Sequence, residues 1–253
     1  MSEAVIEVKN LTRTFDTGET RVEALRGVDL TVEKGQFLSI MGPSGSGNST
    51  LLHLLGGLDL PSDGIVELDG TNIATLNDDE LTLFRRRRIG FVFQAFNLLD
   101  VLTAEENVAI PLLVDGIAES TANQRASNAL ERVGLAHRKG HWPSRMSGGE
   151  QQRVAVARAL VTEPALILAD EPTGNLDSKN GDQVMDLLRN LVDEQQQTIV
   201  MVTHDPRQAA RGDRLIRLRD GLILEDQTID KSRPFREVVQ AIASAIENGE
   251  EDA

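Results

Sequence analysis

Short, almost continuous runs of apolar residues recur along the chain. They are FLSIM at 37–41, IGFVF at 89–93, ALILA at 165–169 and TIVMVT at 198–203, followed near the end by RLIRL and LILE. Helix-like patterns lie between these runs. Apolar runs that alternate with helices are typical of strands buried on both faces of a parallel sheet. The pattern therefore predicts an α/β fold with a largely parallel core sheet.

Other patterns predict additions to this core. Near the start, VIEVKNLTRTF and VEALRGVDLTVEKG alternate apolar and polar residues with period two, which predicts an antiparallel β layer. From about 97 to 157 the strand signal disappears and helical periodicity dominates, as in ANQRASNALERVGL, which predicts an inserted helical subdomain. Near the C-terminus, apolar residues at helical spacing predict an amphipathic helix. We expect its apolar face to pack on its own domain or to contact a dimer partner. The residues of that face are Phe235, Val238, Val239, Ile242 and Ile246.

These patterns divide the chain into successive segments. We expect the antiparallel β subdomain and the first part of the core in 1–96, and the helical subdomain in 97–157. The second part of the core then occupies 158–230, and a C-terminal helix with an acidic tail occupies 231–253.

Composition and charge narrow the class of protein. Of 253 residues, 40% are hydrophobic and 26% charged, which is typical of a globular chain. No apolar run approaches the roughly 18 to 20 residues that span a bilayer. The sequence has no leader pattern and no cysteine, so we expect a cytoplasmic location. The net charge of -14 argues against nucleic-acid binding, and the basic cluster at 85–88 is interpreted as a solvated helix face.

The first candidate site is GPSGSGNST, at 42–50, between a predicted strand and a predicted helix. It matches the phosphate-binding pattern G-x-x-x-x-G-K-[ST] except that Asn48 replaces the lysine. Its glycines let successive N–H groups face phosphate oxygens, and the helix adds its positive end. Ser49 would give a hydroxyl to Mg²⁺ and Thr50 a second phosphate contact. The loop residues expected to bind phosphate are Gly42, Ser44, Gly45 and Gly47. The alternative is an ordinary strand-to-helix turn.

The second candidate is LILADEP, in which Asp170 and Glu171 end a buried strand. Adjacent strand residues point to opposite faces, so the two carboxylates have room for two tasks. We expect Asp170 to face Mg²⁺ and Glu171 to face the water that attacks the γ-phosphate. The alternative is a polar strand end with two solvated acids.

A third group lies at the ends of other predicted strands. In TIVMVTHDP, His204 follows a core strand, at the sheet edge where open α/β sheets bind ligands. Gln94 follows IGFVF at the same kind of edge. We expect His204 to contact the γ-phosphate or the attacking water, and Gln94 to contact metal and water.

The fourth candidate is MSGGEQQRVAVARAL. Ser147 and Glu150 form an S-x-x-E capping box at the start of an amphipathic helix. That explanation leaves Gly148 and Gly149 unexplained. Two glycines leave the positive helix end bare, which suits the close approach of a phosphate.

With these motifs in order, the chain resembles the nucleotide-binding subunits of ATP-binding-cassette transporters over residues 4 to 226. The resemblance rests on SGGEQQR ahead of LILADEP, followed by TGNLDS and THD. It implies a P-loop NTPase (RecA-like) core with an antiparallel β subdomain and an inserted helical subdomain. It also assigns motif names: Q-loop for Gln94, signature for Ser147 to Glu150, Walker B for Asp170 and Glu171, D-loop for Asn175 to Asp177, and switch for His204. Phe15 stands where the family has an aromatic that stacks on adenine.

The resemblance further implies ATP and Mg²⁺ as cofactors and a second nucleotide-binding subunit as partner. The resemblance implies a head-to-tail dimer in which the signature of one chain closes on the ATP of the other. We expect the partner to be an identical chain, and a different cassette chain is the alternative. A transmembrane permease would hold the chain at the inner face of the membrane. Phe96, Leu98 and Leu99 near the Q-loop either contact this permease or belong to the core of the helical subdomain. LLGGLDLPSDG, RRRRIGFVFQAFNLL and HDPRQAARGDRLIRLRDG resemble the lipoprotein-release and macrolide-export branch.

Asn48 departs from this family at the position of the Walker A lysine. Asparagine is neutral and too short to reach the β- and γ-phosphates, so we expect weakened ATP binding and strongly reduced hydrolysis. Three explanations stand side by side: a deliberate replacement of lysine, a natural regulatory subunit that does not hydrolyse ATP, or a site rescued by Arg13 or Arg21. The alternative function is accordingly that of a non-catalytic interaction subunit with the same fold.

Overall fold

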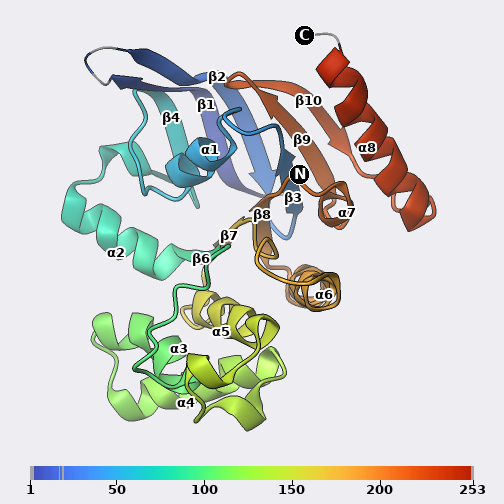
Figure 1. The fold of residues 1–253 in the computed structure, drawn as a ribbon. Coiled ribbons are helices and arrows are strands. Elements are labelled where there is room, and N and C mark those ends of the chain that lie inside the picture. The colour runs from blue at the N-terminus through green and yellow to red at the C-terminus, as the bar shows by residue number, and fades with distance from the viewer. Residues whose placement is uncertain (1–2, 17, 19, 252–253) are drawn as a thin grey trace. The chain divides into compact units, whose positions relative to one another are not determined.

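The computed structural model describes residues 3–16, 18 and 20–251. By its internal contacts the chain forms two compact units (Figure 1). The first unit comprises Met1–Thr75 and Val192–Ala253, and the second comprises Leu76–Leu191. Within the described residues, no helix is long and apolar enough to cross a membrane.

An antiparallel sheet forms part of the first unit. Its strand order is β2-β1-β4-β5. The bounds are Ala4–Asp16 for β1, Arg21–Glu33 for β2, Asp63–Leu68 for β4 and Thr71–Asn72 for β5, with a 3-10 turn η1 at Ile73–Thr75. The period-two segments at the start of the sequence are β1 and β2, which pair antiparallel as predicted.

The parallel strands of the first unit surround β3. This strand, Phe37–Met41, is buried along its whole length and pairs in parallel with β8 (Thr198–Val202) and β9 (Arg214–Arg219). β10 (Leu222–Thr228) pairs antiparallel with β9. The apolar runs predicted as core strands are therefore strands. The helices of this unit include α1 (Asn48–Leu55) and α7 (Pro206–Ala209).

The C-terminal helix α8, Phe235–Glu251, packs on its own unit, which is one of the two alternatives for its apolar face. Val238 and Ile242 are buried in a cluster that includes Met41, Leu215 and Ala209 of α7, and Val239 and Ile246 pack against it. Phe235 is exposed, with the Arg211 guanidinium 5.3 Å from its ring centre. The last two residues of the predicted acidic tail lie outside the described residues.

This packing makes Ile242 a stability determinant of the first unit. Ile242→Ala is expected to lower the free energy of unfolding by about 2 to 5 kcal/mol, because it removes buried methylenes and leaves a cavity. Gln240→Ala, an exposed position on the same helix, is expected to change it by less than about 0.5 kcal/mol. Denaturant unfolding of both variants tests this. Equal effects would mean that α8 is not docked in solution.

The second unit contains parallel strands and the predicted helical insertion. β6 (Ile89–Phe93) and β7 (Leu166–Asp170) pair in parallel, and no strand lies between them in the described residues 94–165. That interval holds α3 (Ala104–Val114), α4 (Glu119–Arg132) and α5 (Gly148–Leu160), which contact one another, and two 3-10 turns, η2 (Ala136–Arg138) and η3 (Pro143–Arg145). α2 is Asp78–Arg88 and α6 is Ser178–Gln195. The segment boundaries predicted above stay predictions.

The basic cluster at the end of α2 is only partly a solvated face, which corrects the interpretation given above. Arg86 lies 3.4 Å from Asp115, just beyond α3, and donates to the Val114 carbonyl at 3.1 Å. Arg87 lies 3.1 Å from the same Asp115 carboxylate. The partner is 28 and 29 residues away in sequence, so local periodicity gives no sign of it.

Candidate functional site

The phosphate-loop candidate has the backbone of a tight strand-to-helix turn in the first unit. β3 ends at Met41 and α1 begins at Asn48, with Gly47 before it at φ 101°. A Cβ on Gly42 would lie 2.1 Å from the Leu218 carbonyl oxygen, so only glycine fits this close approach. The loop therefore holds its shape through backbone contacts that side chains would block.

The start of α1 suits an anion. In this described helix no side chain caps the first turn and none of its residues there is acidic. The first N–H groups of a helix lack intrahelical acceptors and carry a partial positive charge. The Ser46 hydroxyl beside them is buried and, within the described residues, has no hydrogen-bond partner. These donors fit a phosphate group.

Asn48 closes this loop on itself. Its side-chain amide donates to the Gly42 carbonyl oxygen at 3.0 Å. Its Oδ1 is buried and has no hydrogen-bond partner in the described part of the chain. The side chain thus bonds to protein backbone and places no charge in the loop.

His204 lies beside the same loop. It follows β8, which is the parallel neighbour of β3, and His204, Gly42 and Pro43 line one cavity of about 340 Å³. The turn is held from within: the Thr203 hydroxyl accepts from the Asp205 N–H at 3.1 Å, and Asp205 caps α7. The first unit therefore brings His204 to the phosphate-loop candidate, as the sheet-edge argument expects.

Phe15 is partly exposed and already carries a cation on one face. The Arg13 guanidinium lies 4.5 Å from the ring centre, and its Nη2 is 2.9 Å from Asp59. Because this charge is paired with a carboxylate, Arg13 is a poor substitute for the missing lysine. Arg21, at the start of β2, is exposed.

In the second unit, Gln94 and the acidic pair lie at one strand edge. Phe93 and Asp170 are register partners of the parallel strands β6 and β7, so Gln94 and Glu171 each come directly after a partner. β7 ends at Asp170, and Glu171 has left-handed backbone, with φ 47°. The argument that adjacent strand residues point to opposite faces therefore does not apply to Glu171. This residue lies in the turn after β7, and the turn decides where its side chain points.

The Gln94 side chain is paired with the D-loop segment. Its Nε2 donates to Asn175 Oδ1 at 3.3 Å, and Asn175 Nδ2 donates to the Gln94 carbonyl at 3.0 Å. A Cβ on Gly174 would lie 2.7 Å from Gln94 Nε2, so a larger residue there would displace this side chain. This pairing was not expected from the sequence, since the partners are 81 residues apart.

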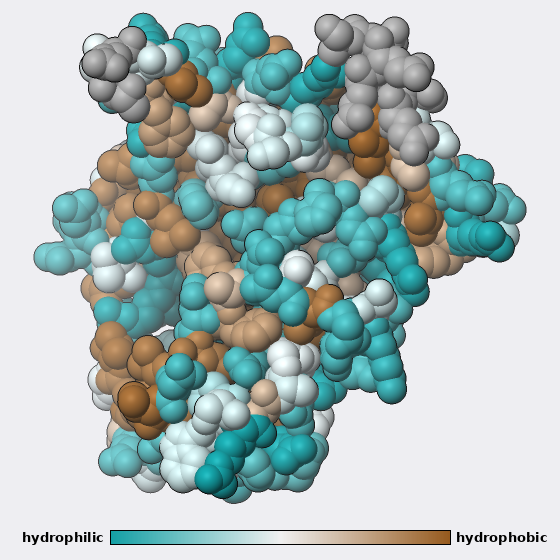
Figure 2. All heavy atoms as spheres, viewed as in Figure 1, coloured by the Kyte–Doolittle hydropathy of each residue, from teal (hydrophilic) through white to brown (hydrophobic). Residues whose placement is uncertain are grey.

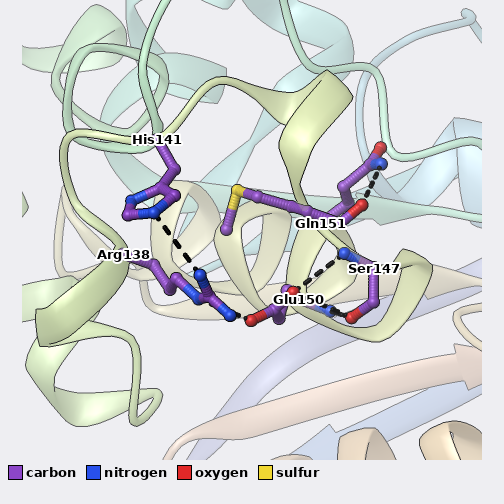
Figure 3. A network of polar contacts seen from close by, with 6 residues as sticks. Arg138, His141, Ser147, Glu150 and Gln151 are labelled. Atoms are coloured by element: carbon purple, nitrogen blue, oxygen red, sulfur yellow. Dashed lines mark hydrogen bonds and ion pairs between the residues drawn. The ribbon is translucent and has the colours of Figure 1, made fainter.

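The signature candidate has the predicted capping box (Figure 3). Ser147 Oγ accepts from the Glu150 N–H at 3.3 Å, and the Ser147 N–H donates to Glu150 Oε2 at 2.8 Å. Sequence analysis missed Arg138, whose Nε donates to Glu150 Oε1 at 2.8 Å and whose Nη1 lies 3.4 Å from His141. The signature glycines Gly148 and Gly149 thus begin a helix whose cap is braced by a cation.

The hydrogen bonds of Glu150 with Ser147 and Arg138 predict the direction in which its pKa is shifted. Burial of the carboxylate opposes its ionisation, but the Ser147 donors and Arg138 outweigh it and lower the pKa of Glu150 below its ordinary value of 4.5. A lowered pKa stabilises the cap above pH 4.5, and the contribution is lost as the pH falls through the folded-state pKa. We expect NMR titration to give a midpoint below 4.5, and Arg138→Met to raise it. A midpoint unchanged by that substitution would contradict the ion pair.

Asp177 directly precedes α6, and its side chain accepts hydrogen bonds from the first turn of that helix. Its Oδ1 accepts from the Asn180 N–H at 3.0 Å and its Oδ2 from Asn180 Nδ2 at 2.5 Å. These hydrogen bonds lower the pKa of Asp177. A Cβ on Gly149 would lie 2.6 Å from Asn180 Oδ1, so the D-loop and signature candidates meet at this asparagine.

Exposed apolar side chains gather in the second unit, over and beside α3 (Figure 2). Leu99 and Val101, in the loop after β6, are 51% and 82% exposed. The buried Asn107 holds this loop: its Oδ1 accepts from the Leu99 N–H at 2.7 Å, and its Nδ2 donates to the carbonyls of Leu99, Leu102 and Thr103. Phe96 instead packs on Gly148, and Leu98 is half-buried, so these apolar residues divide between surface and interior.

A family model described as ABC transporter matches residues 25–174. The chain belongs to the ABC transporter family. The lipoprotein-releasing system ATP-binding protein LolD of Alcanivorax borkumensis is 51% identical over 222 residues, covering 88% of this chain and 97% of that protein. The uncharacterized ABC transporter ATP-binding protein MJ0796 of Methanocaldococcus jannaschii is 47% identical over 229 residues, covering 89% and 97%.

A longer relative shows the same cassette within a larger chain. The macrolide export ATP-binding/permease protein MacB of Bdellovibrio bacteriovorus is 45% identical over 225 residues. These are 89% of this chain and 34% of that protein, so the chain spans about a third of that relative.

A solved structure supports the fold. The dimeric post-hydrolysis state of the cassette MJ0796, bound to ADP and Pi, superposes with a TM-score of 0.81 at 45% identity, covering 89% of this chain and 99% of that one. The predicted α/β fold class is thereby confirmed. The chain is an ATP-binding subunit of an ABC transporter, related to LolD and MacB ATPases.

Proposed function

We propose that this chain is the motor subunit of a membrane transporter of the lipoprotein-release or macrolide-export type. Two relatives described above support this proposal: LolD is named for lipoprotein release and MacB for macrolide export. The observation that carries the proposal is the uncapped start of α1 behind the glycine loop, which offers bare N–H donors to a phosphate chain.

The nucleotide-binding roles follow the motifs. The phosphates bind along the loop and the first turn of α1, and adenine stacks on the face of Phe15 that Arg13 leaves uncovered. The residues we assign to phosphate are Gly42, Ser44, Gly45, Gly47, Asn48, Ser49 and Thr50.

The residues for Mg²⁺ are Ser49, Asp170 and Gln94, all of which offer oxygen. Mg²⁺ is bound by one or two carboxylates together with substrate phosphates and water, so it needs no cluster of acidic residues.

For catalysis we assign Glu171 as the general base for water, His204 to the γ-phosphate end and Gln94 to the metal and water. His204 lines the same cavity as the phosphate loop, which supports its role. The hydrogen bond to Asn175 uses Gln94 Nε2, so Oε1 is the atom that would contact the metal.

The site is completed by a second copy of the chain. In this proposal the signature residues Ser147 to Glu150, with Asp177 of the D-loop, close on the ATP held by the partner chain. MJ0796, 45% identical in its solved form, is dimeric in its ADP- and Pi-bound structure, which supports this arrangement.

A permease is the other partner. The exposed residues Leu99 and Val101 stand on a loop of the second unit and provide an apolar docking surface. MacB, which combines ATP-binding and permease in its name, supports pairing with a permease at the inner face of the membrane. The net charge of -14 disfavours a nucleic-acid partner.

Asn48 weakens this motor. Its amide bonds to Gly42 and adds no charge, so ATP binding falls and hydrolysis falls further. Steady-state ATP hydrolysis by this chain beside its Asn48→Lys variant tests the proposal. If neither form hydrolyses ATP, even with a cognate permease, the result favours the second candidate function. That function is a subunit that opens and closes on the permease without hydrolysing ATP.

A further inference from the structure

Gln152, on the second turn of α5, is completely buried in the second unit. Its Nε2 donates to the Phe93 carbonyl at 3.1 Å and to the Pro172 carbonyl at 2.5 Å. One amide nitrogen therefore joins the signature helix to the ends of two other segments.

Both acceptors adjoin residues with proposed catalytic roles. Phe93 immediately precedes Gln94, and Pro172 immediately follows Glu171. Phe93 closes β6, and Pro172 opens the turn that continues through Gly174. The distance between these two carbonyls is limited by the reach of a single amide group.

Packing alone does not explain a glutamine at this position. Its Oε1 is buried and has no hydrogen-bond partner within the described residues. A buried polar atom without a partner is unfavourable, whereas an apolar side chain of the same size avoids that cost. What Gln152 adds over such a side chain is its pair of N–H donors.

A second side chain of α5 holds the same segment farther along. Arg158 donates through Nη2 to the Phe96 carbonyl at 3.0 Å and through Nη1 to the Asn97 carbonyl. Segment 93–97, which contains Gln94, is thus fixed at both ends by one helix. The signature motif begins that helix.

We propose that Gln152 is a positioning residue, which holds Gln94 and Glu171 in register with the signature helix through the Phe93 and Pro172 carbonyls. The inference rests on the proposed function. A displacement of the first turns of α5, such as closure on a partner chain would cause, moves both carbonyls together. The signature of one chain thereby adjusts the Gln94 and Glu171 of the same chain.

The kinetic test uses the Asn48→Lys background. Gln152→Met keeps the length of the side chain and removes both donors, and Gln152→Glu keeps the shape and presents only acceptors. We expect both to lower kcat by about 10- to 100-fold, since a small misplacement of reacting groups has effects of that size, with KM changed less than about threefold. Gln124→Met, at an exposed glutamine of α4, is the control and is expected to keep kcat. An unchanged kcat, or a rise in KM alone, would overturn the proposal.

Hydrogen exchange in nucleotide-free protein separates this proposal from the proposed function. The Gly174 and Leu176 N–H groups bond to the carbonyls of Glu171 and Thr173, and so report on the turn after Glu171. Gln152→Met is expected to raise their exchange rates at least about tenfold. Gln151→Met removes a neighbouring amide that bonds to Pro143 and Met146 instead, and is expected to leave these rates unchanged. Equal effects of the two variants, or none, would refute the positioning role whether or not the chain hydrolyses ATP.

Discussion

Replacing Asn48 by lysine is expected to raise ATP hydrolysis by about 100-fold or more. A charge-assisted hydrogen bond to phosphate contributes about 1.5 to 3 kcal/mol, which corresponds to roughly 10- to 100-fold in binding. A donor aimed at charge that develops in the transition state adds about 10²- to 10³-fold in rate. In the present chain the Asn48 amide bonds to the Gly42 carbonyl, and lysine in its place frees that carbonyl and extends a cation beyond it.

A variant with a longer but neutral side chain at position 48 distinguishes the effect of the positive charge from the effect of side-chain length. Asn48→Gln is expected to stay close to the activity of the present chain, because glutamine lengthens the side chain without adding charge. Steady-state phosphate release and ATP-binding titrations on the three forms make the comparison. If all three hydrolyse ATP at one rate, another cation replaces the lysine. Arg21 is then the candidate to remove, since Arg13 is paired with Asp59.

Glu171→Gln, made in the Asn48→Lys form, is expected to lower kcat by about 10²- to 10⁴-fold, the contribution of general acid–base catalysis. Glutamine has nearly the same shape as glutamate but cannot take a proton from water. ATP binding is expected to change less than about threefold, because a base for water contributes to the transition state and little to ground-state binding.

Two comparisons sharpen that result. Glu131→Gln, on the exposed face of α4, removes a carboxylate of the same unit and is expected to keep full activity. Asp170→Asn is expected to raise the Mg²⁺ concentration needed for half-maximal rate, since its proposed partner is the metal. Retained hydrolysis in Glu171→Gln would show that another group accepts the proton.

Structure is predicted best from the sequence where residues close together along the chain determine it. The strands β3, β6 and β8 lie where the apolar runs are, because strands buried on both faces need continuous apolar residues. The capping box at Ser147 forms as its spacing indicates, because both partners lie within one helical turn.

Prediction from the sequence fails where a side chain bonds to a residue far along the chain, and where an unexpected turn changes the backbone direction. The pairing of Gln94 with Asn175 and of Arg86 with Asp115 depends on segments brought together only by folding. At Glu171, a left-handed residue interrupts the strand pattern, and a glutamate gives no local sign of this conformation. Gln152 lies within the recognised SGGEQQR motif, yet its burial follows from packing of α5 against the end of β6 and the turn after β7.

Asn107 has a consequence for the proposed association with a permease. Its side chain fixes the backbone from Leu99 to Thr103 through four hydrogen bonds, while Leu99 and Val101 stay exposed. Ordering a loop during association costs conformational entropy, and a loop that is already ordered avoids that cost. The docking surface is therefore preorganised. In the proposed assembly, force from closure of the motor would pass into the permease through a stiff loop instead of being lost in bending of that loop.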